Sequence, residues 1–504
     1  MGQRDIGSKA YFEERERIKK RVLILTVSSY LLVGMVLASA LYFGSIGSLD
    51  LRDLGSSSRA INGFFGGILT AIVLIISLTS NTYTPRLMSV FVHQPPAFFG
   101  LALILLCHLS FIVGAFIGPS HALYELRVYV SITLTCLVVG GVLPYLYYIS
   151  NFMRPRFFLP IIEKEVIDDF KYLSLNKWDK DKQAQIFENI NVITNLASTA
   201  SKRDDKSLIM VVFDMLIGIL VELVELRKED TTNWKVQSPV FLPGVSEEAQ
   251  YHLEKNKTWP EYYILGKCLR EIKALDTNQT EIVSFFSERL LKSMDECLNA
   301  NEDSLVEYHI MALNTLLRES IDADDLSLFQ SISYYYRLGI EILQEDKKHM
   351  GFAARSFIHY GKMVSKKKQL IWKETIMFDL GRIILFFGFV DERFGVGFLN
   401  DFAGTVWRKE YKRDDKISKV AWRAIVKTYW EAQSKGLKSL SSTIFEEYLK
   451  DDRIKHHETI NYLLSHVREL HWEINDRLLS FNHLSSDAGR LAREYQSSEL
   501  KDLL

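Results

Sequence analysis

The stretch GFFGGILTAIVLIISLTSNTYTPR, residues Gly63–Arg86, contains no charged residue before Arg86. Along it, small and hydroxyl-bearing residues recur every three or four positions, which is the spacing of one face of an α-helix. These residues are Gly63, Gly66, Gly67, Thr70, Ser77, Asn81 and Thr84. The opposite side carries Ile, Leu and Val, and Pro85 and Arg86 end the run. We interpret it as a membrane helix with one face for protein or water and the other for lipid.

Three more apolar runs surround this helix, so that the predicted membrane spans are 22–43, 61–78, 97–117 and 128–149. At a rise of about 1.5 Å per residue, each run is roughly long enough to cross a hydrocarbon core of about 30 Å. The charged residues between positions 22 and 149 all lie outside these spans; they are Asp50, Arg52, Asp53, Arg59, Arg86, Glu125 and Arg127. The sequence therefore predicts a four-helix transmembrane domain over 22–157, preceded by a short cytoplasmic helix over 1–21.

The placement of Lys and Arg predicts which side of the membrane each terminus occupies. Five basic residues between Arg15 and Arg21 precede the first span, Arg86 follows the second, and Arg154 and Arg156 follow the fourth. By parity these three groups lie on one side, and short loops rich in Lys and Arg face the cytoplasm. We therefore expect both termini and the whole region after position 157 to be cytoplasmic.

The region after Arg154 is rich in charge and has helical periodicity, so the expected fold class is all-α throughout. We predict a membrane-proximal helical segment over 158–230, an irregular linker over 231–260 and a helical domain of bundle or solenoid-like hairpins over 261–504. No proline occurs after Pro260, which favours successive helices. The run Leu208–Leu226 is apolar almost all round. Its three acidic residues favour a buried core helix over a fifth membrane span.

Pairs of aspartates separate the apolar helices of this region. They are Asp204–Asp205, Asp324–Asp325, Asp414–Asp415 and Asp451–Asp452. An aspartate at a helix N-cap accepts a hydrogen bond from a free backbone N–H and faces the positive end of the helix dipole. We interpret the pairs as turns between helical hairpins. The alternative, a divalent-cation site, is less favoured because none of them has the spacing of a calcium-binding loop.

No catalytic signature occurs in the chain, since Walker, GxGxxG, HExxH and GxSxG motifs are all missing. The GxG at Gly395–Gly397 is interpreted as a turn. The histidines near the C-terminus lack a tight metal-ligand spacing; they are His456, His457, His466 and His471. A net charge of −1 disfavours a nucleic-acid binder. We expect no enzymatic activity, no metal and no cofactor.

One short motif gives a resemblance. Residues Thr79–Leu87, TSNTYTPRL, resemble the end of the second membrane helix in a widespread family of predicted bacterial membrane proteins of unknown function. The segment Asn189–Phe213 resembles the cytoplasmic core of that family, although it lacks the Asn-Asp-Pro expected at Asp204–Asp205. The resemblance implies four N-terminal membrane helices and a location in the bacterial inner membrane. It implies no activity.

Two functions remain open for the polar face of the second span. In the first, the chain is a homo-oligomeric ion channel, with this face lining the pore and Pro85 and Arg86 at its cytoplasmic mouth. In the second, the spans only anchor a helical sensor or scaffold. Gly63 and Gly67 then serve close helix packing. The expected partners are membrane lipid, further copies of the chain, and a cytoplasmic protein or small-molecule regulator.

Overall fold

The computed structural model of the protein describes most of the chain after position 94. Before it, only residues 22–24, 26–31, 33–34 and single positions between 63 and 77 are described. The other described ranges are 95–116, 124–152, 154–175, 179–228, 234, 245–275, 279–364, 366–400, 406–407, 416–465 and 479–502. Within these ranges the chain forms helices and short connections, with no strand. The predicted all-α class is therefore confirmed for the described residues.

The chain forms two compact units, Met1–Met215 and Leu216–Leu504. The border between them falls inside helix α8 (Lys206–Leu226).

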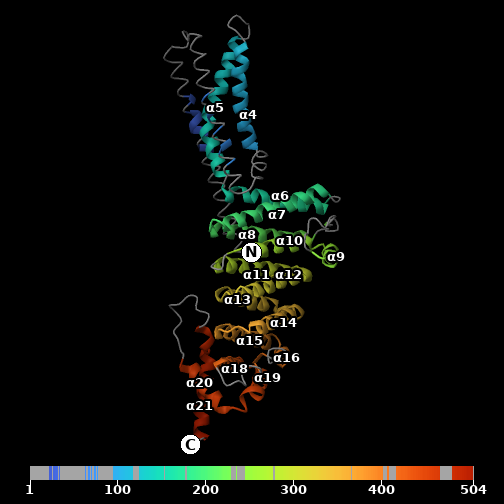
Figure 1. Ribbon diagram of the computed structural model, residues 1–504, viewed down its shortest axis with the longest axis vertical. Helices are drawn as coiled ribbons and strands as arrows, with labels where there is room; N and C mark the ends of the chain where they lie inside the picture. The colour runs from blue at the N-terminus through green and yellow to red at the C-terminus, as the bar shows by residue number, and fades with distance from the viewer. Residues whose placement is uncertain are drawn as a thin grey trace. The chain divides into compact units, whose positions relative to one another are not determined.

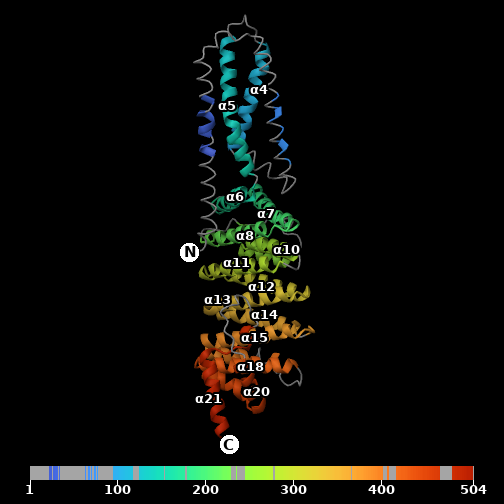
Figure 2. The ribbon, with the colours of Figure 1, turned by 90° about the vertical axis from the view of Figure 1, so that its left-hand side faces the viewer.

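In the first unit, α4 (Pro95–Phe116) and α5 (Tyr124–Phe152) lie side by side (Figures 1 and 2). Gly100 makes their close approach possible, because a Cβ atom there would lie 2.3 Å from the ring of Tyr145. Helix α5 bends by 40° between Thr133–Val142 and Pro144–Asn151. The predicted kink at Pro144 is confirmed, since a proline removes a backbone hydrogen bond and crowds the preceding turn.

A helical hairpin follows α5 in the same unit, made of α6 (Pro155–Leu175) and α7 (Lys180–Ser201). Asp179 caps α7 by accepting hydrogen bonds from the backbone N–H groups of Asp181 and Lys182. The Nζ atom of Lys182 reaches back to Asp169 of α6 at 2.6 Å. The cap and this ion pair fix the start of α7 against α6.

Among the described residues, one helix, α8, is both long enough and apolar enough to cross a membrane. The two arms of α5 would add a second span if they are counted together. Four spans are thus not supported by this criterion, and the first two predicted spans lie largely outside the described residues. Most of α8 is buried, with Ile209, Val212, Leu216 and Leu220 essentially inaccessible. Such burial is what the core-helix interpretation of Leu208–Leu226 predicts.

The second unit is a stack of helices that follow one another in chain order from α10 to α15 (Figure 1). Its first helices are α9 (Glu247–Asn256), α10 (Trp259–Lys273), α11 (Thr280–Asn299), α12 (Asp303–Asp322) and α13 (Leu326–Ile342). The stack continues through η3 (Leu343–Glu345), α14 (Lys347–Val364), α15 (Leu370–Val390) and α16 (Glu392–Phe398). The last elements are α18 (Lys416–Ser434), α19 (Lys438–Ile444), the π-helical turn Phe445–Leu449, α20 (Arg453–Ser465), η6 (Leu479–Asn482) and α21 (Ser486–Asp502).

From α11 to α13, each helix of the stack packs on the next helix and on the next but one. Helix α11 contacts α12 and α13, α12 contacts α13 and α14, and α13 contacts α15. On α11, the inward face is made by Ile282, Phe286, Leu290 and Met294, all inaccessible and four residues apart. Such nearest-neighbour packing is typical of helical-repeat proteins, in which each hairpin buries its apolar face against its neighbours.

The aspartate pairs form the turns that the sequence predicts. In the described pairs, the second aspartate is the N-cap: Asp205, Asp325 and Asp452 each accept a backbone N–H three residues ahead at 3.0 Å. In the first two turns, the preceding Asp204 and Asp324 have a φ of 55° and end the previous helix. The capping interpretation is confirmed there, and Asp414–Asp415 lies outside the described residues.

Two local predictions differ from the structure. The predicted linker 231–260 contains α9, which Ser246 caps, and its last residues begin α10. Helix α9 is short and mostly polar, so it leaves little apolar periodicity to detect. The predicted turn at Gly395–Gly397 is a helix, α16. Its Gly395 lies against α15, where a Cβ atom would be 2.6 Å from the backbone nitrogen of Gly388.

Candidate functional sites

The predicted polar face of the second span is described at five of its positions. Gly63, Gly66, Gly67, Thr70 and Ser77 are helical and exposed. No atom lies within 4 Å of the Cβ position that a side chain would take at any of the three glycines. The same exposed face also carries Val73 and Leu74, so it is mixed rather than wholly polar. Asn81, Thr84, Pro85 and Arg86 lie outside the described residues.

The three glycines and the two hydroxyl residues described on this face are exposed. The hydroxyl of Thr70 donates to the carbonyl oxygen of Gly66 in its own helix at 2.8 Å. A hydroxyl bonded in this way satisfies its donor locally and keeps lone pairs for an outside partner. The face is therefore available to a second chain or to water.

An apolar cavity of about 610 Å³ lies in the first unit, between α4, α5, the start of α6 and residues near position 26. None of the described residues that line it is charged. Its polar lining includes Thr26 and the rings of Tyr30, Tyr145 and Tyr148. The Tyr30 hydroxyl is bonded to the Leu137 carbonyl at 3.1 Å. A cavity of this composition suits hydrocarbon.

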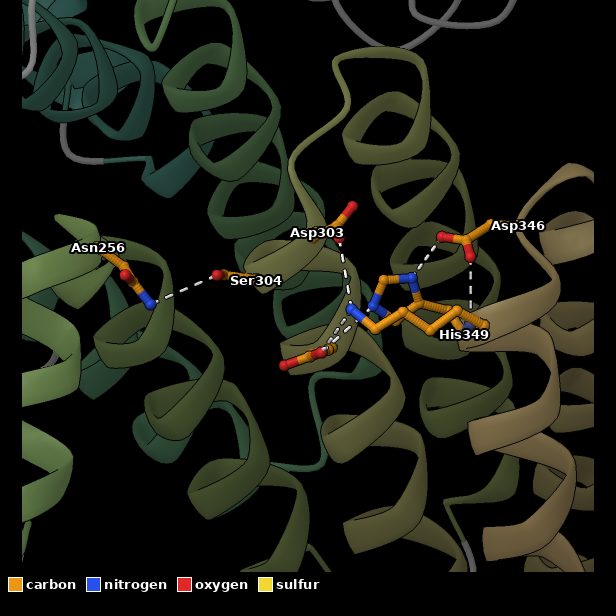
Figure 3. A network of polar contacts seen from close by, with 7 residues as sticks. Asn256, Asp303, Ser304, Asp346 and His349 are labelled. Carbon is orange, nitrogen blue, oxygen red and sulfur yellow. Dashed lines mark hydrogen bonds and ion pairs between the residues drawn. The ribbon is translucent and has the colours of Figure 1, made fainter.

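In the second unit, a polar network surrounds the buried imidazole of His349 at the start of α14 (Figure 3). Asp346 is the N-cap of this helix and accepts the His349 backbone N–H at 3.1 Å. The second Asp346 oxygen accepts a hydrogen bond from the His349 Nδ1–H. The other ring nitrogen, Nε2, lies 3.3 Å from a carboxylate oxygen of Glu307 on α12.

Asp303 and Lys348 complete this network, with Asp303 and Asp346 drawn on either side of the imidazole (Figure 3). The Lys348 Nζ lies 3.5 Å from Asp303 and 3.7 Å from Glu307. One oxygen of Asp303, one of Asp346 and a ring nitrogen of His349 all lie within 4.8 Å of one another. An imidazole nitrogen and carboxylate oxygens are donors that divalent transition metals accept.

The charge of Asp346 follows from its surroundings. Burial raises the pKa of this carboxyl, but hydrogen bonds from the His349 ring and from backbone N–H groups lower it, and the net pKa lies below the ordinary value. Asp346 is therefore ionised at neutral pH and holds the His349 ring in one orientation. Together with Asp303 and Glu307 it gives three carboxylates around one lysine and one histidine.

Comparisons with known proteins identify no family. No protein-family model, curated protein or solved structure matches the chain. The resemblance drawn from Thr79–Leu87 therefore stays a prediction. Function has to be argued from the residues themselves.

The sequence did not point to the His349 network, although it contains a signal. Asp346 and His349 are three residues apart, and Asp303 and Glu307 are four apart, so each pair shares one helix face. What the sequence does not show is that α12 and α14 pack together. Of the C-terminal histidines that it did consider, His456 is buried among Tyr429, Trp430 and Tyr495. His466 and His471 lie outside the described residues.

A buried ion pair near the start of the second unit serves structure. The guanidinium of Arg227 binds both carboxylate oxygens of Glu261 at 2.8 and 2.9 Å and donates to the Lys257 carbonyl at 2.6 Å. The Trp234 ring covers it, 5.4 Å away. Because each charge is matched by hydrogen bonds, the pair joins the end of α8 to α10 without leaving a buried charge unpaired.

Proposed function

We propose that the protein is a homo-oligomeric ion channel of the cell membrane, with the second membrane helix at the pore and the second unit as a cytoplasmic regulatory domain. The exposed face over Gly63–Ser77 carries this proposal. No atom lies within 4 Å of the Cβ positions of its three described glycines, and the Thr70 hydroxyl donates within its own helix, so the face offers these positions to another chain or to water.

Exposed apolar side chains support the placement of the first unit in a bilayer. Helix α4 exposes Leu105, Leu106, Leu109 and Ile112, each with at least 46% of its surface accessible. In water such a continuous apolar surface is rare on a protein without partners. Helix α4 has 22 residues and no charge, so its length of about 33 Å is close to the thickness of a hydrocarbon core, although among the described residues the span criterion is met by α8. Helix α8 differs from α4, because most of its apolar side chains are buried.

The proposed pore has to be formed by several copies of the chain. Four spans without a charged residue at mid-membrane do not readily enclose water within one chain. Several copies that turn Thr70 and Ser77 towards a common axis would enclose it. Arg86 then lies at the cytoplasmic end of the pathway, where a ring of positive charge favours anions.

A second candidate function is a membrane-anchored scaffold without transport. The stacked hairpins α10–α15 favour it, since helical-repeat domains present long surfaces that bind other proteins. In this case the exposed face of the second span would pack against another helix, as small residues do in membranes.

Flux measurements in liposomes separate the two functions. We expect the reconstituted protein to conduct ions, and a hydrophilic thiol reagent to change the flux of Thr70→Cys and Ser77→Cys variants in a background without the four native cysteines. A Leu109→Cys variant is the matched control, because Leu109 is exposed on α4 and is expected to face lipid. An oligomer without flux would favour the scaffold. Equal effects at Leu109 and Thr70 would contradict the pore assignment.

A further inference from the structure

We propose that the second unit binds a divalent transition-metal cation between α12 and α14. The donors are the Nε2 atom of His349 and the carboxylates of Asp303 and Glu307. Asp346 orients the ring from its other nitrogen. The proposal does not depend on ion conduction, because it concerns only residues of the helical stack.

Hydrogen bonding and burial hold the His349 ring in one orientation. Its Nδ1–H donates to Asp346, so Nε2 is the ring nitrogen that faces α12, and a metal ion would take the place of any proton there. A carboxylate on one ring nitrogen and a metal on the other is the usual arrangement of metal-binding histidines. The ring is 1% exposed, so its position is fixed by packing rather than by solvent.

The other ring nitrogen, Nε2, faces a carboxylate of α12. This atom lies 3.3 Å from a Glu307 oxygen, slightly beyond the normal range for an N–H···O bond. A lone pair on Nε2 and a negative oxygen repel each other unless a positive charge lies between them. A proton, the nearby Lys348 ammonium or a metal ion can provide that charge. Asp303 contacts the same ammonium as Glu307, so its carboxylate borders the same space.

The distances require only small movements of exposed side chains. A metal with donor bonds of about 2.1 Å holds two donors at most about 4.2 Å apart. Glu307 lies 3.3 Å from Nε2, and the donor atoms of Asp303 and His349 lie within 4.8 Å of each other. Asp303 and Glu307 have 65% and 47% of their side chains exposed and can turn inward. The ammonium of Lys348, 68% exposed, neutralises these carboxylates in the structure and can withdraw into water.

The donor set selects the class of cation. One imidazole nitrogen with two carboxylates suits Zn²⁺ or Mn²⁺, whereas Ca²⁺ and Mg²⁺ take oxygen ligands. Because the donors come from α12 and α14, which pack on each other, the ion would join two helices of the stack. Binding would therefore stiffen this part of the second unit.

Isothermal titration of the metal-stripped, full-length protein with ZnCl₂ and MnCl₂ tests the proposal. We expect saturable binding of one ion per chain, and binding at least about tenfold weaker for His349→Gln, Asp303→Asn and Glu307→Gln. Lys348→Ala should bind about threefold more tightly, because a competing charge is removed. His359→Gln is the control, since His359 is an exposed histidine of the same helix, and its affinity should not change.

Three outcomes would overturn the proposal. They are no saturable binding by the unaltered protein, unchanged affinity in the Asp303→Asn and Glu307→Gln variants, or an equal loss in the His359→Gln control. If circular dichroism shows that His349→Gln does not fold, the two carboxylate variants decide the result, because both side chains face solvent. A signal from Ca²⁺ or Mg²⁺ as strong as that from Zn²⁺ and Mn²⁺ would contradict the assigned cation class.

Discussion

At the scale of single residues, the aspartates before the helices act through local hydrogen bonds. Asp452 accepts the Lys455 backbone N–H at 3.0 Å, which satisfies one of the free donors at the start of α20. Its neighbour Asp451 is exposed and is not the cap. Because such caps depend only on the next three residues, the sequence was enough to predict them.

The cap gives the first prediction. Asp452→Ala should lower the free energy of unfolding by about 1 kcal/mol, whereas Asp451→Ala should change it by less than about 0.5 kcal/mol. Urea unfolding followed by circular dichroism measures both values. Equal losses in the two variants would show that charge rather than capping matters in this turn.

His309 gives a prediction about pH. Burial lowers the pKa of this imidazole to about 4, although its bond to the Leu305 carbonyl opposes the shift. Below the ordinary value of 6.5 the unfolded chain takes up a proton before the folded chain does, so stability falls as the pH falls from about 6.5 to about 4. Between pH 7 and pH 5 we expect a loss of about 2 kcal/mol from this group.

The control for this effect is His309→Gln, in which the amide can keep the bonds to Leu305 and Ser293 and does not titrate. Urea unfolding at pH 7 and pH 5 should show a smaller loss for the variant than for the unaltered protein. An identical loss in both proteins would mean that other groups cause the pH dependence.

At the scale of elements, close helix approach rests on a few glycines that the sequence does not mark as special. In α16, Gly395 faces the backbone of Gly388 in α15, while no atom lies within 4 Å of the Cβ position of Gly397. The two glycines look equivalent in the sequence, where they form a GxG. Only the packing of α15 on α16 distinguishes them.

This difference predicts opposite effects for two similar variants. Gly395→Ala should destabilise the second unit by about 1–3 kcal/mol, because backbone atoms of α15 cannot move aside. Gly397→Ala should stabilise it by roughly 0.5–1 kcal/mol, since alanine favours the helix. Thermal unfolding of both variants tests this, and destabilisation of equal size in both would contradict the packing.

At the scale of the whole molecule, the sequence predicted the helical class, the kink at Pro144 and the turns at Asp205, Asp325 and Asp452. Each of these features depends on residues that lie close together in the sequence. It missed α9, the role of Gly395 and the network of His349. These depend on which helices are neighbours in space, or on a segment too polar to show an apolar face.

The central claim at this scale is that the face of the second span meets another copy of the chain. The most direct test is oxidative crosslinking of a Thr70→Cys variant without native cysteines, in membranes, followed by electrophoresis without reductant. We predict a crosslinked species at twice the chain mass of 58.2 kDa, and no such species for Leu109→Cys. A Thr70→Cys variant that remains at the mass of one chain would contradict the account.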